Sequence, residues 1–234
     1  MATPLFFGAD GRPLARPEDV IHYLGKREAH WKARFSAYET AHSWFAAHDV
    51  PPAVRATLDA DPVFAEARLI KAIFEKQTVL DDFARGASQT DVLAILETRS
   101  GLAVLGVEGK VNEPFGSTVN EWNDFSPARL RRLAGLVERL RLAPSVSIGT
   151  LRYQLLHRAV ATLLEAKAAG AHDAVMLVQS FNPDDVTNHF GDFQDFATAL
   201  GAPVSHPGML SRVVDLQGVR LQIGWTINPM KSAA

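Results

Sequence analysis

The chain of 234 residues contains no cysteine. It can therefore form neither a disulfide framework nor a thiolate zinc site, which fits a reducing compartment. Long apolar runs are missing too, since stretches such as Ala174–Val178 are far shorter than the roughly 20 residues that cross a bilayer. The first twenty residues have no early basic run, unlike a signal peptide. The sequence therefore predicts a cytoplasmic protein without a membrane segment.

A strong charge of one sign is also lacking. The formal net charge is −2, which gives no general attraction to polyanions, so a nucleic-acid site would have to come from local clustering. The apolar fraction of 47% is enough for a full core and argues against disorder over the whole length. The length favours a single domain over 1–234, in which 1–62 is a mainly helical extension and 63–234 an α/β core.

The first third of the chain has a helical pattern. Residues Glu18 to about Leu80 are predicted to be helical, with breaks at Gly25 and Pro51. Ser36 and Glu39 have the spacing of a capping box for a helix that runs to about His48. The apolar positions after Pro62, from Phe64 to Phe74, also follow a helical period. We expect a second long helix there.

The pattern becomes strand-like after Gly86. Asp91–Glu97 and Leu102–Val111 are rich in Val, Leu and Ile on both faces, which is typical of strands covered by helices on both sides. Further elements are predicted as helices at 126–142, 150–169 and 192–200, a buried strand at 174–180, and a hairpin of 213–216 with 219–225. This order favours an α/β fold with a mixed central sheet flanked by helices.

The hairpin places three charged residues together. If Ser100 and Gly101 are the central turn residues, paired positions have numbers that sum to 201, so Asp91 faces Lys110. Glu108 lies two residues from Lys110 and projects from the same face. Two carboxylates and an ammonium at the end of apolar strands need a partner, because burying unpaired charge is costly. Mg²⁺ would be such a partner, since it takes one or two carboxylates together with water and substrate phosphate.

The string Ser88-Gln89-Thr90-Asp91, an apolar strand, a tight turn and Val107-Glu108-Gly109-Lys110 resembles the Asp…Glu-x-Lys signature of PD-(D/E)XK nucleases. Outside the hairpin, the resemblance covers roughly Phe64 to Ser180 through the order of the elements. The segments Val107–Gly116 and Arg152–Arg158 also resemble a group of bacterial proteins without an established activity.

This resemblance implies a restriction-endonuclease-like core, Mg²⁺ or Mn²⁺ as cofactor and hydrolysis of phosphodiester bonds. It implies metal binding by Asp91 and Glu108, with the carbonyl of Gly109 free to approach the ion, and a catalytic role for Lys110. Several subgroups carry a Gln on the helix after the lysine strand, a place that Gln154 could fill. Many members also have a Glu on the first core helix, and Glu39, Glu66 and Glu75 are equal candidates for this position.

Basic side chains supply candidate contacts to a polyanion. The predicted helix 126–142 carries five arginines, of which Arg131 and Arg132 are candidates for substrate binding. His157 and Arg158 share a helix face with Gln154, and Arg152 lies just before them. Trp122 could stack on a base, but an aromatic residue there more often covers the core. An ordinary solvated helix face is the alternative for all of these residues.

Three hypotheses about function follow. The first is a metal-dependent nuclease that acts on DNA or RNA, with a protein partner or a homodimer as further expectations. The second is a nuclease-like fold that has lost catalysis and serves as a binding or regulatory module. The third treats the signature as chance, with a solvated ion pair between Asp91 and Lys110, and predicts a small-molecule enzyme with a closed apolar pocket.

Overall fold

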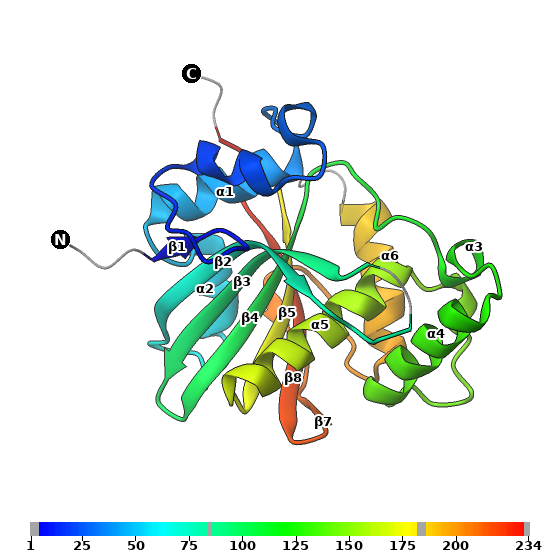
Figure 1. Ribbon diagram of the computed structural model, residues 1–234. Coiled ribbons are helices and arrows are strands. Elements are labelled where there is room, and N and C mark those ends of the chain that lie inside the picture. Colours follow the sequence, from blue (N-terminus) through cyan, green and yellow to red (C-terminus); the bar gives the residue numbers. More distant parts are fainter. Residues whose placement is uncertain (1–4, 84–85, 182–185, 232–234) are drawn as a thin grey trace.

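A computed structural model describes residues 5–83, 86–181 and 186–231. Within these residues, the chain folds around one mixed sheet in the order β1-β2-β3-β4-β5-β8-β6, with β7 added on β8 (Figure 1). Strands β2, β3 and β4 are antiparallel neighbours, whereas β4, β5 and β8 are parallel. The strands are β1 (Phe6–Phe7), β2 (Arg68–Thr78), β3 (Ser88–Thr98), β4 (Gly101–Lys110), β5 (Asp173–Ser180), β6 (Met209–Leu210), β7 (Val214–Leu216) and β8 (Val219–Ile227).

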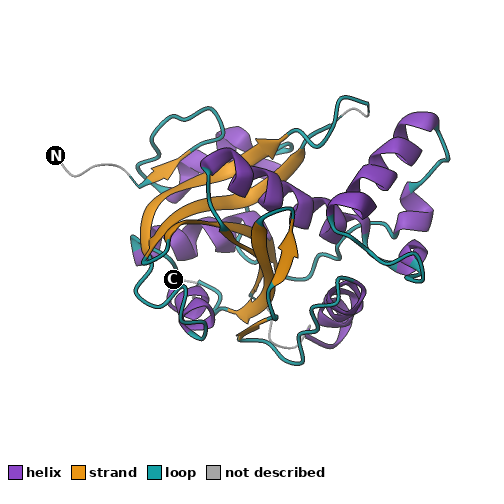
Figure 2. Ribbon diagram, turned by 90° about the horizontal axis from the view of Figure 1, so that it is seen from below, coloured by secondary structure: helices purple, strands orange, loops and turns teal. Residues whose placement is uncertain are grey.

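Helices cover both faces of the sheet, which confirms the predicted α/β class (Figures 1 and 2). Helices α1 and α2 pack on one face and α5 crosses the other, while α3 and α4 lie beside the sheet. Within the described ranges, no helix combines the length and the apolar character that a membrane span requires. The α-helices are α1 (Ser36–Ala47), α2 (Pro52–Asp59), α3 (Val119–Trp122), α4 (Pro127–Arg139), α5 (Tyr153–Ala169) and α6 (Val186–Ala199).

The two faces of the β3–β4 hairpin contribute side chains to two separate apolar cores, as the sequence predicts. Leu93 and Val104 pack toward α5, whereas Val92 and Leu105 pack toward α1 and α2. Gly106 allows α5 to approach, because a β-carbon there would lie 2.2 Å from the Thr162 hydroxyl. Because both faces of these strands are buried, packing from both sides fixes the open end of the hairpin.

The prediction of a helix after Pro62 is wrong. Residues 68–78 form strand β2, which pairs with both β1 and β3. The pairing shifts register between Leu69 and Lys71. This irregularity breaks the period-two alternation of the strand, so Leu69, Ile70, Ile73 and Phe74 take spacings that imitate a helix.

Two local predictions also need correction. The turn of the hairpin lies one residue earlier than expected: Thr98 pairs with Gly101 and Leu93 with Gly106, so paired numbers sum to 199 instead of 201. A shift of two in this sum keeps the side chains of the paired residues on their predicted faces, but the pairing ends at Val92 with Val107, so it does not extend to Asp91. The capping box is wrong as well. Phe35 is the N-cap of α1, and the Glu39 carboxylate accepts a hydrogen bond from the Arg34 amide 2.8 Å away.

Candidate functional site

The residues of the predicted signature meet where the β3–β4 hairpin opens against the first turns of α5. Asp91 lies near the start of β3, and Glu108 and Lys110 lie at the end of β4. Gln154 and Arg158 reach them from α5, because residues four apart share one helix face. We call the set formed by these five residues and Glu75 the charge cluster.

Glu108 is the centre of the charge cluster. The Lys110 ammonium donates a hydrogen bond to its Oε1 at 2.8 Å, and Gln154 Nε2 donates to the same oxygen at 2.7 Å. Arg158 Nε donates to the other oxygen, Oε2. Gln154 also accepts a bond from Lys110 through its own Oε1 at 3.2 Å. Glu108 is only 3% exposed, so these bonds replace the water it loses on folding.

Electrostatics fix the charge state of Glu108. Burial alone would raise its pKa, but the positive charges of Arg158 and Lys110 outweigh burial and lower the pKa to about 2. The side chain is therefore a carboxylate at any physiological pH. The three donors hold it in one orientation beside the ammonium group.

Asp91 has a different environment. One of its oxygens, Oδ2, accepts a hydrogen bond from the Gly109 amide at 2.7 Å, which ties β3 to β4 beyond their last paired residues. Burial and the negative charge of Glu108 raise the pKa of Asp91 to about 7, although Arg158 and Lys110 oppose the shift. Its negative charge is therefore poorly compensated within the protein.

Glu75 is the third carboxylate of the charge cluster. It lies on β2 between residues that pair with Val92 and Thr90, and its left-handed φ of 58° is unusual for a residue with a side chain. Gln89 donates a hydrogen bond to its carboxylate. Burial and the charge of Asp91 raise the pKa of Glu75 to about 8. Strained backbone of this kind concentrates at functional sites.

The other two candidates for the additional Glu are not in the charge cluster. Glu66 is exposed in a turn, where it pairs with Arg99. Glu39 does lie on a helix and is buried, but its oxygens accept the backbone amides of Arg34 and Lys231. Glu75 therefore lies beside the signature residues, on a strand and not on a helix. The sequence could not reveal this, because the irregular β2 imitates a helix.

The chemistry of the donors suits a hard divalent cation. Among the described residues, three carboxylates meet only two cationic side chains, and burial together with mutual repulsion raises the pKa of Asp91 to about 7 and that of Glu75 to about 8. A divalent cation would favour the ionised form of both groups, and oxygen ligands are what Mg²⁺ and Mn²⁺ prefer. Asp91 and Glu75 have the most available oxygens, whereas Glu108 would have to release Arg158 or Lys110. In the described ranges, no three His, Cys, Asp or Glu side chains already stand in a metal-binding arrangement.

Helix α1 closes the charge cluster from the opposite face. A β-carbon on Gly109 would lie 2.2 Å from the Thr40 hydroxyl and 3.3 Å from Asp91 Oδ2, so only glycine permits this approach. The Thr40 hydroxyl is buried and has no hydrogen-bond partner among the described atoms. Glu113 holds α1 in place by accepting the Ser36 amide at 3.0 Å. The sequence offered no signal for Thr40.

His157 and Ser88 form the wall beside Arg158. The Ser88 hydroxyl lies 2.9 Å from His157 Nδ1 and accepts a bond from Arg158 at 2.9 Å. Burial and the charge of Arg158 lower the pKa of His157 to about 3, so the imidazole is neutral. His157 can then position Ser88 and Arg158, but it carries no charge for a phosphate.

The remaining predicted contacts lie away from the carboxylates. Arg132 is buried in an ion pair with Asp81, at 2.7 Å. Arg131 is exposed, and its guanidinium lies 5.0 Å from the centre of the Phe83 ring. Arg152 pairs with Asp192 at 2.9 Å. None of these three side chains touches Glu108.

The charge cluster opens to the outside through a depression of about 460 Å³. We call it the lysine cavity. Lys110, Gln154 and Arg158 line it together with Gln89, and the loop after β4 forms its other side.

The fold and the charge cluster define an α/β protein with a mixed sheet whose parallel and antiparallel halves meet at a buried set of acidic and basic side chains. The chain belongs to the family described as "Domain of unknown function (DUF6946)", whose model matches residues 13–230. No curated protein and no solved structure matches the chain.

Proposed function

We propose that this protein is a divalent-metal-dependent hydrolase of phosphodiester bonds in nucleic acid, with a restriction-endonuclease-like core. The observation that carries the proposal is the meeting of Asp91, Glu108 and Lys110 at a place where carboxyl groups outnumber cationic side chains. These residues come from two strands and are joined by Gln154 from α5. If the sequence signature were a chance match, there would be no reason to expect contacts between its residues.

The order of the elements supports the same proposal. The Asp strand and the Glu-x-Lys strand form a hairpin, and a helix with a Gln directed at the lysine follows. The resemblance seen in the sequence implies these features together. The later strand β5 lies beside β4 along its whole length and completes the sheet under α5.

Each residue then has a role that follows from its position. When bound, a divalent ion would neutralise charge on the phosphate and make a water molecule more acidic. Asp91 and Glu75 would hold that ion, with Glu108 as a further ligand. Lys110 would stabilise negative charge that develops on the phosphate oxygens as the bond to the leaving oxygen breaks. Gln154 and Arg158 would orient Glu108 and Lys110.

A specific observation favours the second candidate function, an inactive nuclease-like binding module. Both oxygens of Glu108 are already engaged, by Lys110, Gln154 and Arg158. In a module without catalysis, Arg158 would take the place of a metal permanently. Metal binding separates the two candidates, because the module predicts none.

A small-molecule enzyme has less support. Polar side chains line the lysine cavity as much as apolar ones do, whereas a small-molecule site is mostly apolar. A larger and more apolar cavity, of about 680 Å³, lies between α1, the start of α2 and residues 228–231. It contains none of the residues of the charge cluster.

A nuclease assay tests the proposal. The purified protein is incubated with single-stranded and double-stranded DNA and RNA, in Mg²⁺, in Mn²⁺ and in EDTA. We expect cleavage only with metal, and a loss of at least about a hundredfold in Asp91→Asn and in Lys110→Met, since charge stabilisation of this kind contributes that much. Glu66→Gln removes an exposed carboxylate outside the charge cluster and should cleave like the wild type.

Cleavage that persists in EDTA, or that survives Asp91→Asn, would contradict the proposal. If no substrate is cleaved and no metal binds, the binding module becomes the better explanation. Circular dichroism of each variant shows that the fold is kept.

A further inference from the structure

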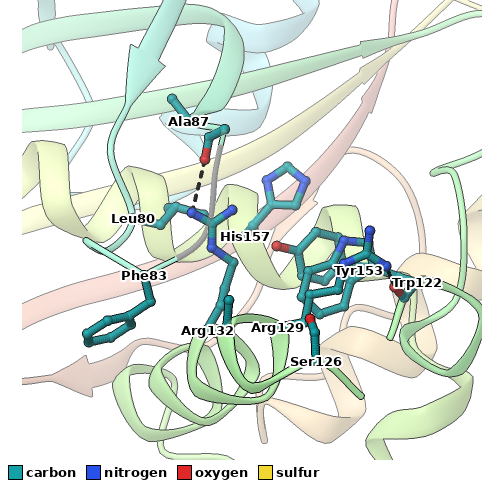
Figure 3. Close-up of a pocket in the computed structure, with 11 residues that line it drawn as sticks. Leu80, Phe83, Ala87, Trp122, Ser126, Arg129, Arg132, Tyr153 and His157 are labelled. Atoms are coloured by element: carbon teal, nitrogen blue, oxygen red, sulfur yellow. Dashed lines mark hydrogen bonds between the residues drawn. The ribbon is translucent and has the colours of Figure 1, made fainter. Parts of the chain in front are cut away.

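A second depression adjoins the lysine cavity (Figure 3). Its volume is about 530 Å³, and it lies between the first half of α4 and the residues Leu80, Phe83, Gly86 and Ala87. We call it the aromatic cleft. Trp122, Tyr153 and His157 line both depressions, so the two lie next to each other at these side chains. The aromatic cleft is lined by Leu80, Phe83, Trp122, Arg129, Arg132 and Tyr153, among others.

The walls of the aromatic cleft combine flat rings with guanidinium groups. Trp122 stacks on Tyr153 with ring centres 3.8 Å apart and an angle of 10°, and Arg129 lies over the Trp122 ring at 5.1 Å. Phe83 is 53% exposed, which is high for a ring of this size, and Arg131 lies over it. Figure 3 shows Phe83 and the Trp122–Tyr153 stack on either side of Arg132.

These features suit a ligand with a flat aromatic part and a negative charge. An exposed Phe ring costs free energy in water and gains it when another aromatic surface covers it. Every nucleic-acid base has such a surface, and stacking on aromatic side chains tolerates any sequence. In a duplex, both faces of a base are already covered by its neighbours. Away from the ends of a duplex, only an unpaired base can therefore stack on Phe83.

We propose that the aromatic cleft binds an unpaired nucleotide next to the phosphate held in the lysine cavity, so that the substrate is single-stranded nucleic acid. The inference rests on the proposed function, because that function places a phosphate beside Lys110. The base stacks on Phe83, and Arg131 and Arg129 bind the backbone that follows. Arg132 stays in its ion pair with Asp81 and supports the wall.

Binding without metal tests the inference separately from catalysis. Fluorescence anisotropy of a labelled oligothymidylate and of a duplex of equal length is measured in EDTA, with the full chain. We expect the single strand to bind more tightly than the duplex. Phe83→Ala should weaken single-strand binding by at least about fivefold, because stacking of one base contributes that much.

Matched controls separate the cleft from the general surface. Phe35 is also exposed, at 40%, and Arg99 is an exposed arginine, and both lie outside the cleft. Phe35→Ala and Arg99→Ala should bind like the wild type, while Arg131→Ala should weaken binding. Equal affinity for duplex and single strand, or wild-type binding by Phe83→Ala, would overturn the inference. Single-strand binding without any metal-dependent cleavage would instead refute only the proposed function.

Discussion

Two buried sets of charges in this protein differ in their balance. In the first, Asp81 and Arg132 are each 7% exposed and join the segment after β2 to α4 through two hydrogen bonds, of 2.7 and 3.3 Å. Among the described residues, the carboxylate of Asp81 meets the guanidinium of Arg132. In the charge cluster, the carboxylates of Glu75, Asp91 and Glu108 meet two cations of the described part of the chain, Lys110 and Arg158.

The difference shows what each set contributes. A balanced pair offsets the cost of its own burial and fixes two segments relative to one another. An unbalanced set keeps a cost that apolar residues would avoid. The surplus of carboxylates beside Lys110 is therefore more than a balanced ion pair requires, and it is what a site for a cation needs. Three predictions can break or sharpen this comparison.

The largest effect is expected from removing a cation of the charge cluster. Arg158→Met should lower the free energy of unfolding by about 3–5 kcal/mol, because Glu108 stays buried with one partner fewer. The double variant Glu108→Gln with Arg158→Met should recover a large part of that loss. Urea unfolding at pH 7.5 measures both. Arg99→Met, which breaks an exposed pair, should cost at most about 1 kcal/mol. A similarly small loss in Arg158→Met would contradict the account.

The same chemical change should have opposite effects in the two sets. Asp91→Asn removes one of the excess negative charges and should raise the free energy of unfolding by about 1 kcal/mol at pH 8 in EDTA. Asp81→Asn removes the charged partner of Arg132 and should lower the free energy of unfolding by about 1–3 kcal/mol. Thermal or urea unfolding of the two variants and the wild type, under the same conditions, measures both changes. Destabilisation of both would show that the charge cluster is an ordinary balanced network.

The smallest effect concerns the pH dependence of stability. The pKa of His157 falls from 6.5 to about 3 on folding, so the unfolded chain takes up a proton below pH 6.5 that the folded protein refuses. Stability that is present above pH 6.5 is therefore lost as the pH falls. Between pH 7.5 and 5.5, the wild type should lose about 1 kcal/mol more than His157→Gln. If the free energy of unfolding changed with pH in the same way in both proteins, the prediction would be contradicted, and His157 would be in contact with water.

The sequence predicted the parts of the fold that depend on strong local patterns. Strands β3, β4 and β5 and helices α4 and α5 lie close to their expected positions, since apolar alternation and helix starts such as Ser126-Pro127 are local signals. Strand β2 was missed, because its irregular pairing is set by neighbours that no local pattern encodes. The error mattered, since β2 carries Glu75.

The period of two along a strand predicts that Asp91, Glu108 and Lys110 lie together. The error in the turn leaves the faces of the paired residues unchanged, and these three residues lie just beyond the last pair, Val92 with Val107. The contacts of Gln154 and Arg158 with Glu108 depend on where α5 crosses the sheet. The close approach of Thr40 to Gly109 depends on α1 in the same way. Tertiary packing sets both positions, so they could only be found in the structure.

Isothermal titration of Mn²⁺ into the wild type and into Asp91→Ala tests the central claim most directly, with Glu66→Ala as a control for surface carboxylates. The account predicts one binding event in the wild type and in Glu66→Ala, and none in Asp91→Ala. Binding that is unchanged in Asp91→Ala, or absent from the wild type, would contradict the claim that the unbalanced charge cluster is a site for a divalent cation.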